Sequence, residues 1–129
     1  MEKIIEIKET IGYSDNNRYQ DYDGYTITTT EQEIFIGISN EQSCCESWGY
    51  FIVDSDYKWI IGTEFLGIEV VDEIYDVTKM IDVYDGGAVF VNILTSQGMI
   101  QIVVYNAHNG YYGHSIIIRS KQFNLDTGA

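Results

Sequence analysis

Proline is absent from this chain of 129 residues, and cysteines and basic residues are few. The only two cysteines, Cys44 and Cys45, are adjacent, and a disulfide between neighbours is strained. A disulfide framework is therefore excluded, and a reducing, cytoplasmic setting is expected. No apolar run reaches the length of a membrane span, and the N-terminal MEKIIEIKET has no signal-peptide core. Neither a membrane location nor secretion is expected.

The shortage of cations bears directly on function, because 7 Lys and Arg face 20 Asp and Glu, for a net charge of −13. Nucleic-acid binding rests on several Lys or Arg contacts with phosphate, and anionic membrane surfaces attract the same side chains. Neither partner is expected. Such a charge commonly keeps a surface soluble, and the alternative is an acidic decoy that imitates nucleic acid. The scattered positions of the acids favour the first reading.

β-forming residues, in contrast, are abundant. Residues 25–30 and 33–38, separated by Glu31-Gln32, predict a hairpin, and residues 47–53 and 66–71 predict two further strands. Three runs near the C-terminus, residues 88–95, 99–105 and 115–119, predict an antiparallel meander. Its first connection is the short loop Ser96-Gln97-Gly98.

A short helix is predicted after the strand at 47–53. Asp54 or Asp56 would cap it, and Gly62 lies near its C-terminal end. No linker or repeat divides the chain. We therefore predict a single domain over residues 1–129 with an α+β fold, mainly an antiparallel β-sheet meander with one or two short helices.

The stretch YNAHNGYYGHSIIIRS, residues 105–120, concentrates polar, ring-bearing and cationic side chains. Tyrosine and histidine rings can stack on a purine, and asparagine amides can bond its edge. Arg119, assisted by Lys121, would meet a phosphate. The alternative is turn chemistry around Asn109-Gly110. The other candidate ligand-binding residues in this stretch are Asn106, His108, Asn109, Tyr111, Tyr112 and His114.

The sequence gives little support for a catalytic site or a metal site. His108 and His114, six residues apart, match no standard metal spacing, and a zinc site needs three or four ligands. Glu46 beside the two cysteines disfavours a reactive thiolate. We therefore expect no enzyme activity, no catalytic residue, no metal and no cofactor.

Phe90 and Asn92 form a second candidate group. In the run AVFVNIL, Val89, Val91 and Ile93 share one face of a strand, while Phe90 and Asn92 lie on the other. An asparagine on a central strand must find a partner or face a groove. The pair therefore predicts either an ordinary sheet face or a ring and an amide that hold a base at a subunit interface.

The segments QSCCESWGYF, VFVNI and VVYNAHNGYYGHSIIIR together resemble the first family of Thoeris anti-defence proteins, in order and spacing from about residue 20 to about residue 120. The resemblance implies a phage protein that acts as a sponge in the cytoplasm of the bacterial host. It would hold cyclic ADP-ribose isomers, made by TIR-domain immune enzymes, without cleaving them. Some members also hold cyclic oligonucleotides. Homodimers or higher homo-oligomers with pockets at their interfaces are implied as well.

The resemblance also implies roles for individual residues. Phe90 would lie against adenine, and Asn92 and Arg119 would surround the pyrophosphate. A second C-terminal arginine is missing, so Lys121 or His114, or Arg18 or Arg119 from a neighbouring chain, would have to replace it.

The function predicted from these observations is the sequestration of a cyclic ADP-ribose-type signal without cleavage. One alternative is an acidic inhibitor or decoy that blocks a basic nucleic-acid-binding host defence protein. The other is a small hydrolase that destroys the signal. Phe90→Ala and Arg119→Ala are expected to abolish capture and leave the fold intact.

Overall fold

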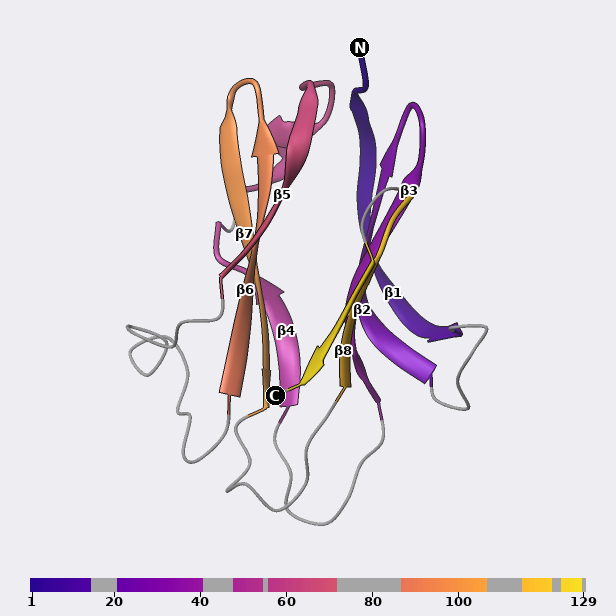
Figure 1. The fold of residues 1–129 in the computed structure, drawn as a ribbon. Helices are drawn as coiled ribbons and strands as arrows, with labels where there is room; N and C mark the ends of the chain where they lie inside the picture. The colour runs from indigo at the N-terminus through magenta and orange to yellow at the C-terminus, as the bar shows by residue number, and fades with distance from the viewer. Residues whose placement is uncertain are drawn as a thin grey trace.

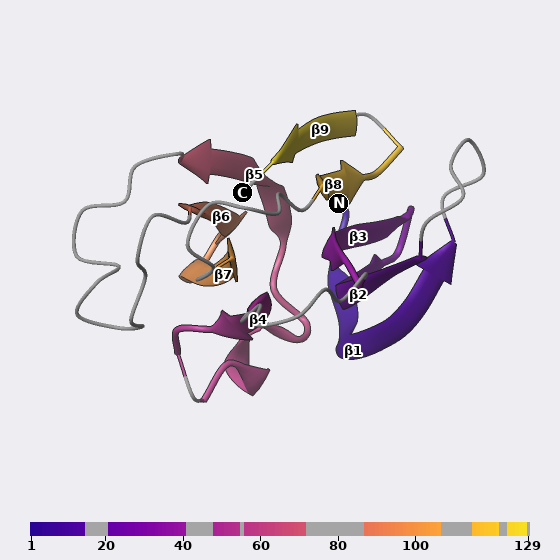
Figure 2. The ribbon, with the colours of Figure 1, turned by 90° about the horizontal axis from the view of Figure 1, so that it is seen from below.

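The architecture of the protein is a sandwich of two antiparallel sheets, seen edge-on in Figure 1 and from one end in Figure 2. The structure is a computed structural model that describes residues 1–14, 21–40, 48–54, 56–71, 87–106, 115–121 and 124–128. Among these residues no helix is long and apolar enough to cross a membrane.

The first sheet has five strands in the spatial order β1-β2-β3-β8-β9. Their bounds are β1 Ile4–Ser14, β2 Asp21–Thr29, β3 Glu33–Ser39, β8 Ser115–Arg119 and β9 Asn124–Gly128. The second sheet has four strands in the order β4-β7-β6-β5. Their bounds are β4 Trp48–Ile52, β5 Phe65–Val71, β6 Gly87–Thr95 and β7 Gly98–Asn106. All described pairings between these strands are antiparallel.

The core lies between the two sheets and consists mainly of isoleucine and valine. β2, β3 and β8 contribute one set of buried side chains, and β6 and β7 contribute the facing set. Because successive side chains of a strand point to opposite faces, this alternation defines an inner and an outer face for each sheet. Such β-branched side chains pack well on a pleated surface. The inner-face residues of the central strands are Ile27, Ile34, Ile36, Ile38, Ile116, Ile118, Val89, Val91, Ile93, Ile100, Ile102 and Val104.

Two predicted hairpins are confirmed. Between β2 and β3, the N–H of Thr29 donates to the carbonyl of Gln32 over 2.8 Å, which closes the turn at Glu31-Gln32. Between β6 and β7, the Thr95 hydroxyl donates to the carbonyl of Gly98 over 2.6 Å, and Gly98 has a φ of +136°. The polar and glycine signals at these two turns identified the connections correctly.

The helical part of the α+β prediction is wrong for the described residues. The predicted helix is a single 3₁₀ turn, η1, over Lys58–Ile60. Its N-cap is Tyr57, with no side-chain capping hydrogen bond, and Asp54 accepts from the indole of Trp59 over 3.4 Å. Gly62 does follow the turn, with a φ of +89°.

The third run of the predicted C-terminal meander lies elsewhere. β6 and β7 pair as predicted, but β8 belongs to the first sheet, between β3 and β9. Antiparallel meanders are instead formed by β1-β2-β3 and by β5-β6-β7. β8 carries three consecutive buried isoleucines, so both of its faces are covered.

A contact between the sheets joins β4 to β1 near one edge of the sandwich. The Tyr50 hydroxyl donates to Oε2 of Glu9 over 2.5 Å, and the Tyr25 and Tyr50 rings meet edge to face, with centroids 5.3 Å apart. Burial raises the pKa of the Tyr50 phenol, and the hydrogen bond to Glu9 and its negative charge raise it further. The pKa of Tyr25 is raised as well, first by burial and then by Glu9.

Candidate functional site

The strand register places one row of side chains straight across the outer face of the first sheet. Lys8 of β1 pairs with Thr26 of β2, Thr26 with Phe35 of β3, and Phe35 with Arg119 of β8. Since neighbouring strands are about 4.8 Å apart, the Lys8 and Arg119 backbones are separated by roughly 14 Å. The row thus has a cation at each end, with a hydroxyl and an aromatic ring between them.

Two glycines form the next row and lower the surface of the sheet. Gly24 of β2 lies opposite Gly37 of β3. A Cβ on Gly24 would be 1.9 Å from the carbonyl oxygen of Ile36, and a Cβ on Gly37 would be 2.4 Å from Cζ of Phe35. The Phe35 ring therefore lies over the Gly37 backbone, which explains why it is only 2% exposed on an outer face.

A bulge in β1 brings a second ring onto Phe35. The register with β2 shifts between Thr10 and Tyr13, and Gly12 there has a φ of +74°. The N–H of Gly12 donates to Oδ1 of Asp23 over 3.0 Å and so anchors the bend. Tyr13 then stacks on Phe35, with ring centroids 3.9 Å apart and planes inclined by 6°. β1 thus bends at the bulge and continues to pair with β2 as far as Ser14.

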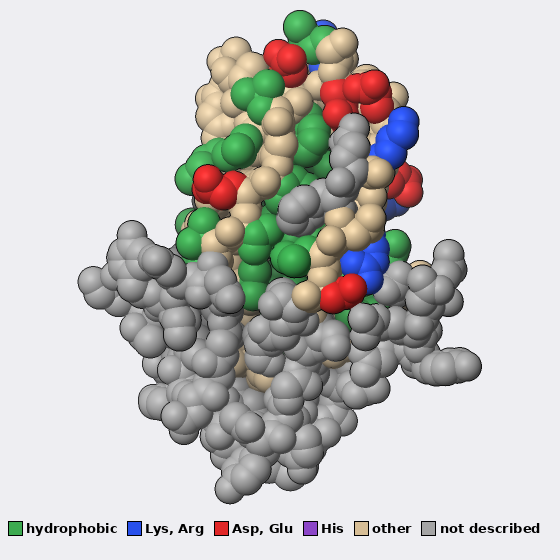
Figure 3. All heavy atoms as spheres, in the orientation of Figure 1, with side chains coloured by type: hydrophobic (Ala, Val, Ile, Leu, Met, Phe, Trp, Pro, Cys, Tyr) green, Lys and Arg blue, Asp and Glu red, His purple; other side chains and the backbone are tan. Residues whose placement is uncertain are grey.

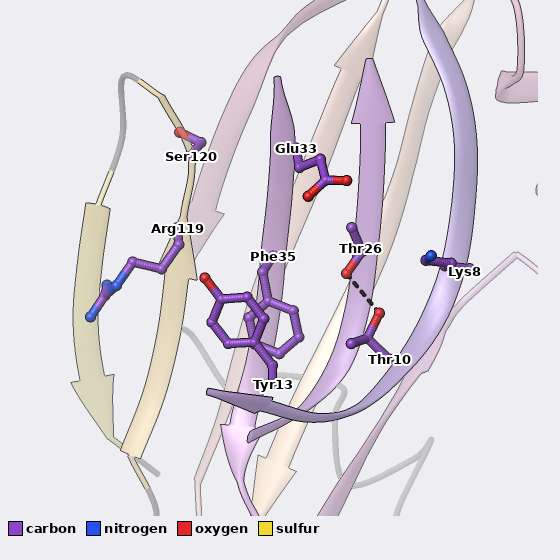
Figure 4. A pocket seen from close by; sticks show the side chains of 8 residues that line it. All are labelled: Lys8, Thr10, Tyr13, Thr26, Glu33, Phe35, Arg119 and Ser120. Carbon is purple, nitrogen blue, oxygen red and sulfur yellow. Dashed lines mark hydrogen bonds between the residues drawn. The ribbon is translucent and has the colours of Figure 1, made fainter. Parts of the chain in front are cut away.

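These features enclose a pocket with a volume of about 430 Å³ on the outer face of the first sheet (Figure 4). This size falls in the range of small-molecule sites, roughly 300 to 1,000 Å³. Strands β1, β2, β3 and β8 carry most of its lining. The residues that line it are Lys8, Thr10, Tyr13, Thr26, Glu33, Phe35, Arg119 and Ser120.

The centre of the pocket is polar. The hydroxyls of Thr10 and Thr26 share a hydrogen bond of 2.7 Å, drawn as a dashed line in Figure 4. Lys8 has an ion pair with Glu6 at 4.0 Å, between two largely exposed side chains, and such pairs contribute little. The Lys8 ammonium therefore loses little if it turns to another anion.

Arg119 is held by its own sheet. Its guanidinium donates to Oδ1 of Asp126 over 2.7 Å and to the carbonyls of Ile118 and Leu125 over 3.2 and 3.1 Å. Figure 4 shows the guanidinium directed toward β9 and away from the stacked rings. Arg119 therefore forms one wall of the pocket and fastens β9 to β8. Lys121 is outside the lining, and its N–H donates to the Gln32 side chain over 2.9 Å.

Phe90 and Asn92 lie on the outer face of the second sheet. Phe90 is 7% exposed and packs with Val103, Phe51, Val71 and Tyr105. The neighbouring row has a closed hydrogen-bond pattern across β5, β6 and β7: the Asn92 amide donates to Oε1 of Glu69 over 2.8 Å and accepts from Gln101 over 2.9 Å.

The structure therefore separates the predicted site residues. Arg119 and the Phe90–Asn92 pair face outward from opposite sheets, so they share no pocket within one chain. Asn106 is buried at the end of β7, where it pairs with Trp48. The remaining candidates lie outside the described residues. These are Arg18, His108, Asn109, Tyr111, Tyr112 and His114.

Most of the pocket was not predicted from the sequence. Of its lining, only Arg119 was a candidate. A usable signal existed in Gly24 and Gly37, because a glycine within each of two hairpin-paired strands indicates a hollow or a close approach. Within the described ranges, no cluster of three or more His, Cys, Asp or Glu side chains has the arrangement of a metal site.

Comparison with known proteins places the chain in a family. Residues 1–118 match the family described as "Domain of unknown function (DUF7448)", so the chain belongs to that family. No curated protein and no solved structure matches the chain. Since the family description includes no activity, the resemblance to Thoeris anti-defence proteins stays a prediction.

Proposed function

We propose that this protein is a binding protein that captures a cyclic ADP-ribose-type signal, without cleaving it, in the outer-face pocket of the first sheet. The observation that carries the proposal is the pocket itself. It combines a weakly engaged lysine, two hydroxyls and a stacked pair of rings in a volume suited to a nucleotide. The resemblance in sequence supplies the ligand class. On the same ground we propose that the protein acts in the bacterial cytoplasm during phage infection.

Each part of such a ligand has a counterpart in the pocket. Lys8 would meet the pyrophosphate as a charge, and whichever of the Thr10 and Thr26 hydroxyls accepts their mutual hydrogen bond would donate its own proton to a phosphate oxygen. The Tyr13 ring, stacked on the buried Phe35, would offer an aromatic surface to the adenine. Arg119 would add positive potential from the far wall while it remains bonded to Asp126.

The strong negative charge of the chain opposes the approach of an anionic ligand. At cellular salt the Debye length is about 8 Å, so distant exposed acids contribute little inside the pocket. Among the described lining residues Lys8 and Arg119 are cations and Glu33 is an acid, and the two cations are also paired with Glu6 and Asp126 outside the lining. The charge would slow association more than it would weaken binding.

The outer face of the second sheet supports capture less well. A base that stacks on Phe90 would have to enter a buried apolar cluster, and a ligand that bonds Asn92 would have to displace Glu69 or Gln101. Breaking such buried hydrogen bonds costs free energy before any is gained. The first-sheet pocket requires no comparable rearrangement.

The acidic-decoy alternative requires a continuous band of carboxylates. On the described part of the face in Figure 3, acidic side chains stand in small separate groups among hydrophobic and basic ones. This arrangement favours capture of a small ligand over imitation of nucleic acid, whose charges are regularly spaced.

Calorimetric titration with cyclic ADP-ribose and its isomers tests the proposal. We expect nanomolar binding, about −12 kcal/mol, because a sponge must compete with a receptor. Ligand released by heating should be chemically intact. No heat with any isomer would contradict capture, and a degraded product would favour the hydrolase.

A pair of lysine variants tests the position of the site. Lys8→Gln should weaken binding about tenfold, which corresponds to the loss of one charged hydrogen bond. Lys58→Gln, in η1 and outside the lining, makes the same charge change and should leave binding within about twofold. Equal effects of the two changes would show that only overall charge matters.

A further inference from the structure

Glu33 is the one acidic side chain among the described residues that line the pocket. It begins β3, pairs with Thr28 of β2, and lies two residues before Phe35. Figure 4 shows its carboxylate reaching from β3 toward the Thr26 side of the pocket. Among the described residues, no hydrogen bond or ion pair involves this carboxylate.

A carboxylate at this place has chemical consequences for the ligand. An ionised carboxylate only accepts hydrogen bonds, through two oxygens side by side. It repels a phosphate and attracts a pair of donors, such as the two hydroxyls of a ribose. Carboxylates recognise ribose hydroxyls in this way in dinucleotide-binding folds. The distance between Glu33 and Lys8 also suits this ligand. The two residues are two strands apart across the sheet and two residues apart along the strands, so their backbones are roughly 12 Å apart.

We propose that Glu33 is a specificity-determining residue that accepts hydrogen bonds from a vicinal ribose diol of the captured ligand. The inference rests on the proposed function and adds an orientation of the ligand in the pocket. The phosphate would lie at the Lys8 end, and the sugar hydroxyls would lie at the Glu33 end. A ligand with a second phosphate in place of the diol would be rejected by the carboxylate. The pocket thereby selects nucleotides with a free ribose diol over nucleotides that carry a phosphate in its place.

The sign of one substitution effect separates this role from a bystander role. If Glu33 merely lies near an anionic ligand, its removal relieves repulsion and binding becomes tighter. If Glu33 accepts hydrogen bonds from the diol, its removal costs charge-assisted hydrogen bonds and binding becomes weaker. Glu33→Gln tests this choice because it keeps the size of the side chain and removes the charge.

The experiment titrates cyclic ADP-ribose at physiological salt into wild type, Glu33→Gln and Glu31→Gln. Glu31, in the adjacent turn and outside the lining, is the matched control for the change in net charge. We expect Glu33→Gln to weaken binding about tenfold. Glu31→Gln should stay within about twofold of wild type, and thermal melting should show both variants folded.

The outcomes distinguish the two proposals. Wild-type binding with Glu33→Gln equal to or tighter than wild type would overturn the role of Glu33 and leave the proposed function standing. An equal loss in both variants would also overturn it, since it would reflect net charge alone. An absence of binding by the wild-type protein would overturn the proposed function, and the assignment of Glu33 with it.

Discussion

The outer faces of the two sheets differ in how their side chains are arranged. The face of the second sheet is filled and closed: Phe90 lies in an apolar cluster, and Asn92 is bonded on both sides, to Glu69 and Gln101. The face of the first sheet carries a pocket, next to a pair of glycines over which the Phe35 ring packs, and the pocket holds a carboxylate without a partner among the described residues. A sheet face whose polar groups bond one another adds stability, whereas an exposed carboxylate beside a pocket can exchange its water for a ligand's donors.

The largest expected effect is on the filled face. Phe90→Ala would leave a cavity among Val103, Phe51 and Val71 and should lower the free energy of unfolding by about 4 kcal/mol. The expectation from sequence that this change leaves the fold intact therefore does not agree with the burial of Phe90. Urea denaturation measures the loss. A loss below about 1 kcal/mol would mean that Phe90 is not part of a packed cluster.

The next largest effect is on the outer face of the first sheet. Gly24→Ala should cost about 3 kcal/mol, because its Cβ would meet backbone atoms of Ile36 that cannot rotate away. Gly12→Ala is the matched control, since no atom lies within 4 Å of its Cβ position. It should cost roughly 1 kcal/mol through its positive φ alone. Equal losses for both glycines would contradict the close approach of Gly24 to the β3 backbone.

The smallest effect lies between the two sheets and is independent of either outer face. Tyr50→Phe removes the hydrogen bond to Glu9, which is exposed, so the cost near neutral pH is roughly 0.5 kcal/mol. The pKa of Tyr50 is raised from its ordinary value of 10.0, so above pH 10 the folded protein keeps a proton that the unfolded chain releases. The wild type should therefore lose stability as the pH rises above 10.

Urea denaturation of both proteins at pH 8 and pH 11 measures this difference. The advantage of the wild type over Tyr50→Phe should be present at pH 8 and shrink at pH 11. An advantage that grows with pH would contradict the raised pKa of Tyr50.

Hairpins were predictable from the sequence where two β-forming runs are separated by a clear turn signal. Both conditions hold at the β2–β3 and β6–β7 connections. β1 was missed because bulges shift its register, so its buried residues do not recur with period two. β9 was missed because NLDTG has a single large apolar residue, Leu125. The position of β8 depends on long-range pairing with β3, which local patterns do not encode.

The candidate site was less predictable than the fold. Arg119 was identified from its setting in the sequence, but Lys8, Thr26 and Phe35 come from three different strands. They form one row only through the pairing of β1 with β2 and of β2 with β3, and the bulge at Gly12 then brings Tyr13 onto Phe35. The candidates predicted from the sequence were rings and amides that lie close together along the chain. A row that runs perpendicular to the strands joins residues far apart in the sequence, so no local pattern indicates it.

Mapping of amide chemical shifts tests the location of the site most directly. Cyclic ADP-ribose would be titrated into ¹⁵N-labelled protein. Our account predicts the largest shifts at Thr10, Thr26, Glu33 and Ser120, with Phe90 and Asn92 nearly unchanged. Large shifts at Phe90 and Asn92 with the first-sheet pocket unchanged, or no shifts at all, would contradict it.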